Sequence, residues 1–163
     1  MKRLVLMRHA KSDWTAGGPD HARTLNERGR ASAAALGDWL RAQALLPDEV
    51  LCSTSTRTRE TLAALAIGAP TRFEDRLYHA GPVAMMKSLR DADGDTVLMI
   101  AHNPGIAEFA HEIVARAPQH PRFRDYPTGA TLVAEFDIET WADMTEGSGV
   151  ARAFVIPREL IEA

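Results

Sequence analysis

Two short, wholly apolar runs constrain the fold of this chain more than any other feature. Residues 4–7 and 97–101 contain only aliphatic side chains and methionine, with no alternation of apolar and polar positions. A strand that is apolar on both faces is typical of a parallel sheet covered by helices on both sides. The first run ends at Arg8 and His9 and the second at His102, so both strands are expected to end at polar chemistry.

The segments between these runs have helical periodicity. A helix is predicted over residues 26–43, because Gly29, Ala33, Leu36 and Leu40 recur on one face. The other predicted elements are a strand at 50–52, a helix at 57–67, an extended piece at 76–78, a helix from Pro82, a helix with Asn103 as N-cap and Pro104 at N1, an edge-type strand at 131–136 and an antiparallel final strand at 153–156. This alternation predicts an α/β/α sandwich with a mostly parallel sheet and an antiparallel edge strand. The whole chain, residues 1–163, is expected to form a single domain.

Composition excludes several classes of protein. The net charge of −3 argues against a protein that coats nucleic acid. No apolar run is long enough to cross a membrane, and the apolar run that follows Met1-Lys2-Arg3 is too short for a signal peptide. The single cysteine, Cys52, lies in an apolar run and is expected to be a buried, inert thiol. A cytoplasmic protein that binds neither nucleic acid nor membrane is therefore expected.

Cationic and imidazole side chains follow three predicted strands. Arg8 and His9 end the first, Arg57 follows the second at a strand-to-helix junction, and His102 ends the fourth. Ligands bind beyond the carboxyl ends of the strands in sheets of this kind. The planar guanidinium group can hold two phosphate oxygens at once, and imidazole can act as a nucleophile. These four residues therefore predict a phosphate pocket.

The same residues resemble a known family. Three segments are similar to the histidine phosphatase superfamily, branch 1. They are Arg8-His9-Ala10 with the residues up to Trp14, Ser53 to Arg57 with Glu60-Thr61 behind it, and His102-Asn103-Pro104-Gly105. Within this superfamily, they look most like the SixA-type phosphohistidine phosphatases. The resemblance runs from residue 4 to about residue 133. It implies a phosphoglycerate mutase-like fold and a metal-independent phosphatase with no cofactor.

The resemblance also implies roles for individual residues. His9 would be the nucleophile that forms a phosphohistidine intermediate, Arg8 and Arg57 would hold the phosphate, and His102 would donate to a phosphoryl oxygen. Arg23 matches an arginine that reaches the pocket in SixA-type relatives. The two guanidinium groups are expected to lower the pKa of His9 and keep it neutral. Lys11, Ser12 and Trp14 would form a wall of the pocket or, in the case of Trp14, ordinary packing.

The general acid is left open by the sequence. Glu74 and Asp75 are carboxylates at a spacing that does not match the family pattern, and His79 is the alternative donor. A missing acid favours a phosphohistidine substrate, because imidazole leaves more readily than an alkoxide. The expected partner is a phosphorylated protein, either a phosphotransfer domain or a phosphocarrier.

Three other functions remain as alternatives. One is a small-molecule phosphomonoester phosphatase of the same superfamily, and another is a phosphate-binding module with weak activity. The third is a metallohydrolase that uses His9, His102 and Asp13, with or without His79; the residue spacing disfavours this site. The long loop at 117–130 is either merely solvated or binds an acidic partner through Arg122 and Arg124.

Overall fold

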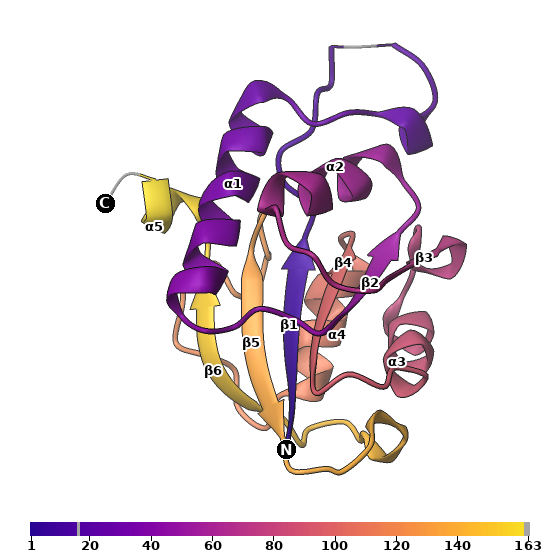
Figure 1. Cartoon of the computed structure of the whole chain (residues 1–163), viewed down its shortest axis with the longest axis vertical. Helices are drawn as coiled ribbons and strands as arrows, with labels where there is room; N and C mark the ends of the chain where they lie inside the picture. Colours follow the sequence, from indigo (N-terminus) through magenta and orange to yellow (C-terminus); the bar gives the residue numbers. More distant parts are fainter. Residues whose placement is uncertain (16, 162–163) are drawn as a thin grey trace.

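A six-stranded sheet organises residues 1–15 and 17–161, the part of the chain that this computed structural model describes (Figure 1). The strands lie in the order β3-β2-β4-β1-β5-β6. Their bounds are β1 Lys2–Arg8, β2 Glu49–Ser53, β3 Thr71–Glu74, β4 Thr96–Ala101, β5 Thr131–Phe136 and β6 Val150–Val155. The pairs β1–β4, β2–β4 and β2–β3 are parallel, whereas β5 is antiparallel to both β1 and β6.

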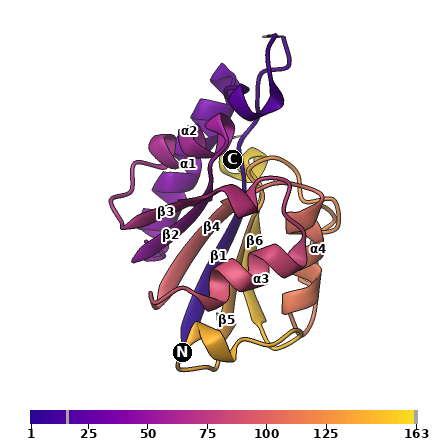
Figure 2. The ribbon, with the colours of Figure 1, turned by 90° about the vertical axis from the view of Figure 1, so that its right-hand side faces the viewer.

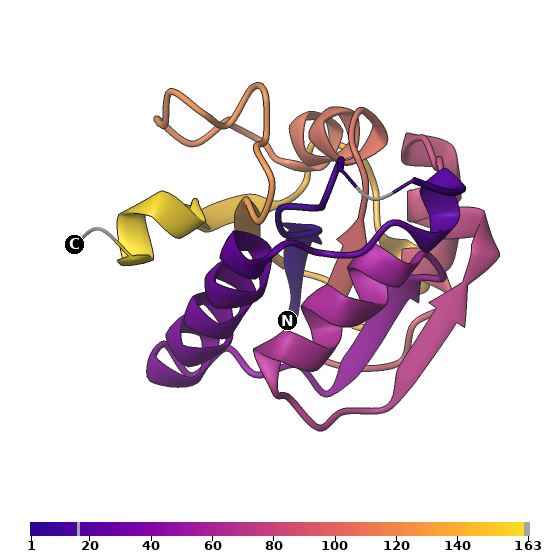
Figure 3. The same cartoon turned by 90° about the horizontal axis from the view of Figure 1, so that it is seen from above.

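Helices cover both faces of this sheet, as Figures 2 and 3 show. Helices α1 and α2 lie on one face, α3 and α4 lie on the other, and α5 packs beside α1. Their bounds are α1 Glu27–Ala42, α2 Thr56–Leu65, α3 Pro82–Arg90, α4 Gly105–Ile113 and α5 Pro157–Ile161, with short 3-10 turns at Asp20–Ala22, Asp75–Leu77 and Trp141–Asp143. The predicted α/β/α sandwich is therefore confirmed, while its extent over residues 1–163 stays a prediction.

The central strand β1 shows why both faces need a helical cover. Leu4 and Leu6 are buried in the core beneath α3 and α4, and Val5 and Met7 are buried in the core beneath α1 and α2. All four side chains are fully buried, so the unbroken apolar run serves two cores at once. This two-sided burial is the pattern that predicted a parallel sheet.

Several predicted elements have different positions in the structure. The strand predicted at the edge, β5, lies inside the sheet between β1 and β6, and the carboxylate of its Glu135 is paired by Arg3 and Arg152 on those neighbours. At this end of the sheet the edge strand is β6, which pairs antiparallel with β5 as expected for the final strand, and β3 is the edge strand at the other end. Residues 76–78 do not form a strand: Arg76 and Leu77 belong to the 3-10 turn Asp75–Leu77, and the strand lies earlier, at Thr71–Glu74.

The start of α4 also differs by one residue from the prediction. Pro104 is the N-cap residue and the helix begins at Gly105. The amide of Asn103 instead donates hydrogen bonds to the carbonyl oxygens of Asp125 and Tyr126, at 2.8 and 3.1 Å. Asn103 therefore ties the loop that precedes β5 to the end of β4, although its oxygen still accepts from the Ala107 amide at 3.3 Å.

No helix in the described ranges is long and apolar enough to cross a membrane. The thiol of Cys52 is buried, and this burial raises its pKa to about 12. The prediction of a buried cysteine is confirmed, and at neutral pH the group stays a thiol with no nucleophilic character.

Candidate active site

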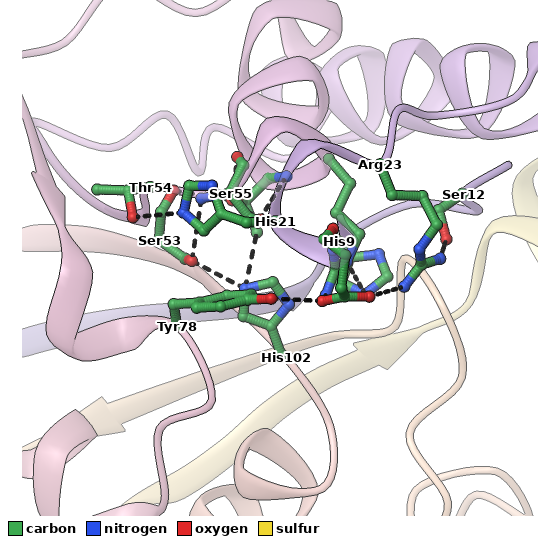
Figure 4. Close-up of polar contacts among 12 residues, drawn as sticks. His9, Ser12, His21, Arg23, Ser53, Thr54, Ser55, Tyr78 and His102 are labelled. Atoms are coloured by element: carbon green, nitrogen blue, oxygen red, sulfur yellow. Dashed lines mark hydrogen bonds and ion pairs between the residues drawn. The ribbon is translucent and has the colours of Figure 1, made fainter. Parts of the chain in front are cut away.

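A cavity of about 370 Å³ opens at the carboxyl ends of β1, β2 and β4. It brings together six of the residues that the sequence singled out for the site: Arg8, His9, Arg23, Arg57, His79 and His102. Lys11, Ser12, Trp14, Asp20, Asn103 and Thr128 complete its lining. Figure 4 shows the imidazoles of His9 and His102 side by side, and their ring centres lie 5.3 Å apart.

The ring of His9 is held in one tautomer. Its Nδ1 lies 2.7 Å from the carbonyl oxygen of Ala10, and because a carbonyl only accepts, Nδ1 carries the proton. Nε2 is therefore unprotonated, and its lone pair accepts a hydrogen bond from Nε of Arg57 at 3.4 Å. The nitrogen that faces the guanidinium of Arg57 is thus the unprotonated one.

Both imidazoles are kept neutral. Burial lowers the pKa of His9 to about 3, and His102, Arg8 and Arg57 add to this effect, while the hydrogen bond to Ala10 opposes it. Burial also lowers the pKa of His102 to about 3, with further contributions from Arg57 and His79. The expected effect of the arginines is present, but desolvation is the larger cause.

These two lowered pKa values predict a pH dependence of stability. Between about pH 6.5 and about 3, the unfolded chain takes up a proton on each histidine while the folded chain does not. The free energy of unfolding is therefore complete above pH 6.5 and falls as the pH drops, by up to ~1.4 kcal/mol per pH unit for each histidine. Urea unfolding between pH 6.5 and 5 measures this slope.

A double variant isolates the contribution of the two histidines. In His9→Gln/His102→Gln, neither side chain can take up a proton on unfolding, so the slope over the same pH range should be flatter. Equal slopes for the double variant and the unmodified chain would contradict the assignment of two neutral, buried imidazoles.

Hydroxyl groups at the end of β2 orient His102. Its Nε2 lies 2.8 Å from Oγ of Ser53 and 3.4 Å from Oγ of Ser55. Oγ of Ser53 also accepts from the backbone amide of Ser55 at 3.4 Å, and its proton can donate to Nε2 of His102. In the tautomer in which Ser53 donates, Nδ1 of His102 carries the ring proton, and this buried atom has no partner among the described residues. In that tautomer the second imidazole has an N–H that no described residue binds.

The guanidinium groups lie around these rings. Arg57, at the start of α2, is buried and donates from Nη1 to the carbonyl oxygen of Asp20 at 2.8 Å. Arg8 donates from Nη1 to the carbonyl oxygen of Tyr126 at 3.1 Å, while its Nε is buried without a partner in the described ranges. Arg59 instead points away, with its guanidinium 4.1 Å above the ring of Phe73.

Arg23 also reaches the cavity. It donates to Oγ of Ser12 and lies 3.6 Å from the centre of the Trp14 ring. Trp14 is 78% exposed, so its main contact here is this stacked guanidinium rather than a core. The predicted pocket wall of Lys11, Ser12 and Trp14 is confirmed, and Trp14 is not ordinary packing.

The site contains a carboxylate that sequence reasoning missed. Asp20 accepts hydrogen bonds from Arg57 at 3.1 Å, from Arg23 at 3.0 Å and from the hydroxyl of Tyr78 at 2.5 Å (Figure 4). The hydrogen bond from Tyr78 and the neighbouring arginines hold the pKa of Asp20 well below its usual range. Asp20 is therefore ionised, and it bridges two of the cations that surround His9. The three-residue spacing from Arg23 was its one visible signal in the sequence.

The other candidate acids have different positions. Glu74 pairs with Arg76 and accepts from Ser88, and Asp75 accepts from Thr54, so neither carboxylate lines the cavity. His79 does line it, and its ring lies 3.9 Å from that of Tyr78. Within the described residues, Asp20 is thus the carboxylate of the cavity lining and His79 is its third imidazole.

Close backbone approaches hold the segments of the site together. A Cβ atom on Gly29 would lie 2.0 Å from the carbonyl oxygen of Lys11, so only glycine lets α1 pack against the segment after His9. The hydroxyl of Thr61 in α2 accepts from the backbone amide of Ala10 at 3.0 Å and donates to the carbonyl oxygen of Arg57. The segment after β1, which carries His9, and helix α2, which carries Arg57, are therefore directly linked.

No group of three or more histidine, cysteine, aspartate or glutamate side chains in residues 1–15 and 17–161 is placed to hold a metal ion. The alternative of a site built from His9, His102 and Asp13, with or without His79, has no support in this geometry. What the arrangement can hold is an anion, because three guanidinium groups face one cavity.

Comparisons with known proteins identify the family and the fold that this chain resembles. The family model described as histidine phosphatase superfamily (branch 1) matches residues 4–81. The uncharacterized protein Rv1276c of Mycobacterium tuberculosis is 35% identical over 159 residues, which cover 93% of this chain and all of that protein. The structure of a candidate phosphohistidine phosphatase SixA from Nakamurella multipartitia is 33% identical, with a TM-score of 0.86 over 96% of both chains. A SixA structure complexed with tungstate shares the fold, with a TM-score of 0.75 and 20% identity over 97% of this chain and 99% of that one.

Proposed function

We propose that this chain, which belongs to branch 1 of the histidine phosphatase superfamily, is a metal-independent phosphatase that hydrolyses protein phosphohistidine. The chain has the phosphoglycerate mutase-like fold of that family. In the first step, Nε2 of His9 attacks phosphorus while the bond from phosphorus to the substrate imidazole breaks. Water then hydrolyses phospho-His9 and releases inorganic phosphate. The partner is a phosphorylated protein, and the cytoplasmic location stays a prediction.

One observation carries this proposal: the unprotonated Nε2 of His9 lies 3.4 Å from a guanidinium nitrogen of Arg57. A phosphoryl group bound by Arg57 would therefore lie next to the lone pair that attacks it. Because Nδ1 keeps its proton through the hydrogen bond to Ala10, the ring needs no proton transfer before the attack.

Guanidinium groups around the cavity support the binding of a phosphoryl group. Arg8, Arg23 and Arg57 all line the cavity, so an anion there would meet three cationic side chains. The planar guanidinium group can donate to two phosphoryl oxygens at once. As negative charge builds on the phosphoryl oxygens, these cationic donors would stabilise the transition state.

The state of Asp20 supports phosphohistidine as the substrate class. Its carboxylate is ionised and bound by Arg57, Arg23 and Tyr78, so it offers no proton to a leaving group. An alkoxide needs such a proton. Imidazole departs more readily because it can leave as a neutral ring when its other nitrogen is protonated. His79 is the remaining candidate for a weak donor in the cavity.

A comparison of two substrates tests the proposal. The purified chain, with a chelator present, is mixed with a phosphohistidine-bearing peptide or with an aryl phosphate ester, and release of phosphate is followed. We expect release from phosphohistidine to be faster by at least about 10²-fold, the typical contribution of a general acid that the ester would lack. Fast ester hydrolysis would favour a small-molecule phosphatase, and tungstate or phosphate binding without turnover would leave a binding module.

A further inference from the structure

A second cavity, of about 340 Å³, adjoins the catalytic one. It lies between the start of α1, the loop at 117–130 and α5, which are close together in Figure 3. Its lining contains four cationic side chains, Lys11, Arg28, Arg122 and Arg158, and no acidic side chain among the described residues. In a chain with a net charge of −3, such a group is a local feature that calls for an explanation.

The two cavities share one wall. Lys11 and Thr128 line both of them. Lys11 follows His9 by two residues, and Thr128 precedes Gly129, whose amide donates to the carbonyl oxygen of His9 at 2.9 Å. A substrate segment that leaves the catalytic cavity past Lys11 and Thr128 would therefore enter the second cavity.

The cations of the two cavities differ in their exposure. Arg57 in the catalytic cavity is 4% exposed, as suits a group that surrounds one compact anion. Lys11, Arg28, Arg122 and Arg158 are all exposed and come from four separate segments of the chain. This spread suits several carboxylates along an extended chain better than one compact anion. Ile156 and Pro157 supply an apolar floor beside these cations.

We propose that this second cavity binds an acidic segment of the phosphoprotein substrate next to its phosphohistidine. The inference rests on the proposed function, because it concerns the same substrate. Arg122 would take part, and although it is paired with Asp125 at 2.9 Å, both side chains are exposed and the pair is open to exchange. Arg124, in the same loop, is exposed but does not line the cavity.

Two matched peptides test this inference. Each carries one phosphohistidine, and the flanking positions are glutamates in the first and glutamines in the second. With the unmodified chain at low salt, we expect kcat/KM to be about tenfold higher for the acidic peptide, because a few exposed ion pairs together have this size. The preference should shrink at high ionic strength, since salt screens exposed charges.

Charge reversal locates the preference. Arg28 lies in the first turn of α1, where a carboxylate is compatible with the helix dipole, so the variant Arg28→Glu should still fold. This variant should lose the preference and keep its activity on the glutamine peptide. Arg124→Glu is the control, because it makes the same change of charge at an exposed residue outside the cavity.

The outcomes separate this inference from the proposed function. Equal kcat/KM values for both peptides with the unmodified chain would overturn the acidic-segment site and leave a phosphohistidine phosphatase. Equal loss of the preference in Arg28→Glu and Arg124→Glu would also overturn it. A third outcome would assign the cavity to a small molecule instead. In that case the unmodified chain shows no preference between the peptides, a bisphosphorylated sugar inhibits it competitively, and this inhibition is lost in Arg28→Glu but kept in Arg124→Glu. Failure on both peptides with rapid ester hydrolysis would refute the proposed function itself.

Discussion

The variant His9→Ala should show no detectable phosphatase activity, with a loss of roughly 10⁴-fold or more, the scale at which removal of a catalytic nucleophile acts. The reason is that, in the proposed mechanism, the lone pair on Nε2 of His9 attacks phosphorus, and neighbouring groups already hold this nitrogen unprotonated. Steady-state release of phosphate from a phosphohistidine peptide measures the loss. Rapid acid-free quenching should also trap a phosphorylated protein with the unmodified chain and none with the variant.

His111→Ala is a suitable control for this experiment. His111 is an exposed histidine on α4 that does not line the cavity, so its removal should leave turnover unchanged. Since His9 is buried, near-ultraviolet circular dichroism should first establish that the His9→Ala variant keeps its packing. A folded His9→Ala protein that retains most of its activity would exclude His9 as the nucleophile.

The variant Arg57→Ala should lose about 10²–10³-fold in kcat, the size reported when one donor to a developing oxyanion is removed. Arg57 is the buried cation next to Nε2 of His9, and its planar guanidinium can donate to two phosphoryl oxygens. Arg57→Lys should recover part of the lost activity, because lysine restores the positive charge but not the planar guanidinium group that donates to two oxygens.

Arg59→Ala offers a matched comparison on the same helix. The guanidinium of Arg59 lies over the ring of Phe73 and outside the cavity, so its removal should cost less than about threefold, within the range of an exposed contact. Similar losses in Arg57→Ala and Arg59→Ala would indicate that α2 acts only as a scaffold, and would remove Arg57 from the phosphate site.

The parts of this molecule that sequence predicted well depend on local pattern. Strands β1 and β4 each contain an unbroken apolar run, at residues 4–7 and 97–101, and each strand is followed at once by a histidine. The fold and the pair His9 and His102 therefore follow from the same segments. Arg57 could be placed because it follows a strand at a helix start. Parallel pairing of β1 with β4 then brings the two imidazoles to one edge without any further information.

The parts that sequence did not predict depend on contacts between distant segments. Strand β5 has a glutamate in its pattern and was expected at an edge, but Arg3 and Arg152 on both neighbours pair with Glu135 inside the sheet. Asp20 begins a three-residue 3-10 turn, and its contact with Arg57 spans 37 residues, so no local pattern reveals it. The short strand Thr71–Glu74 is only partly buried and has no clear alternation, which is why it was missed.

The bridge that Asp20 makes between Arg57 and Arg23 means that the catalytic cavity carries its own counter-ion. On the proposed function, an arriving phosphoryl group would meet two guanidinium groups whose charge a carboxylate already partly neutralises, and it would share or displace that carboxylate. Binding would then be an exchange of one anion for another, and the same carboxylate would return when phosphate departs. A pocket built in this way would hold its product less tightly than its count of arginines implies, which would favour repeated turnover over retention of phosphate.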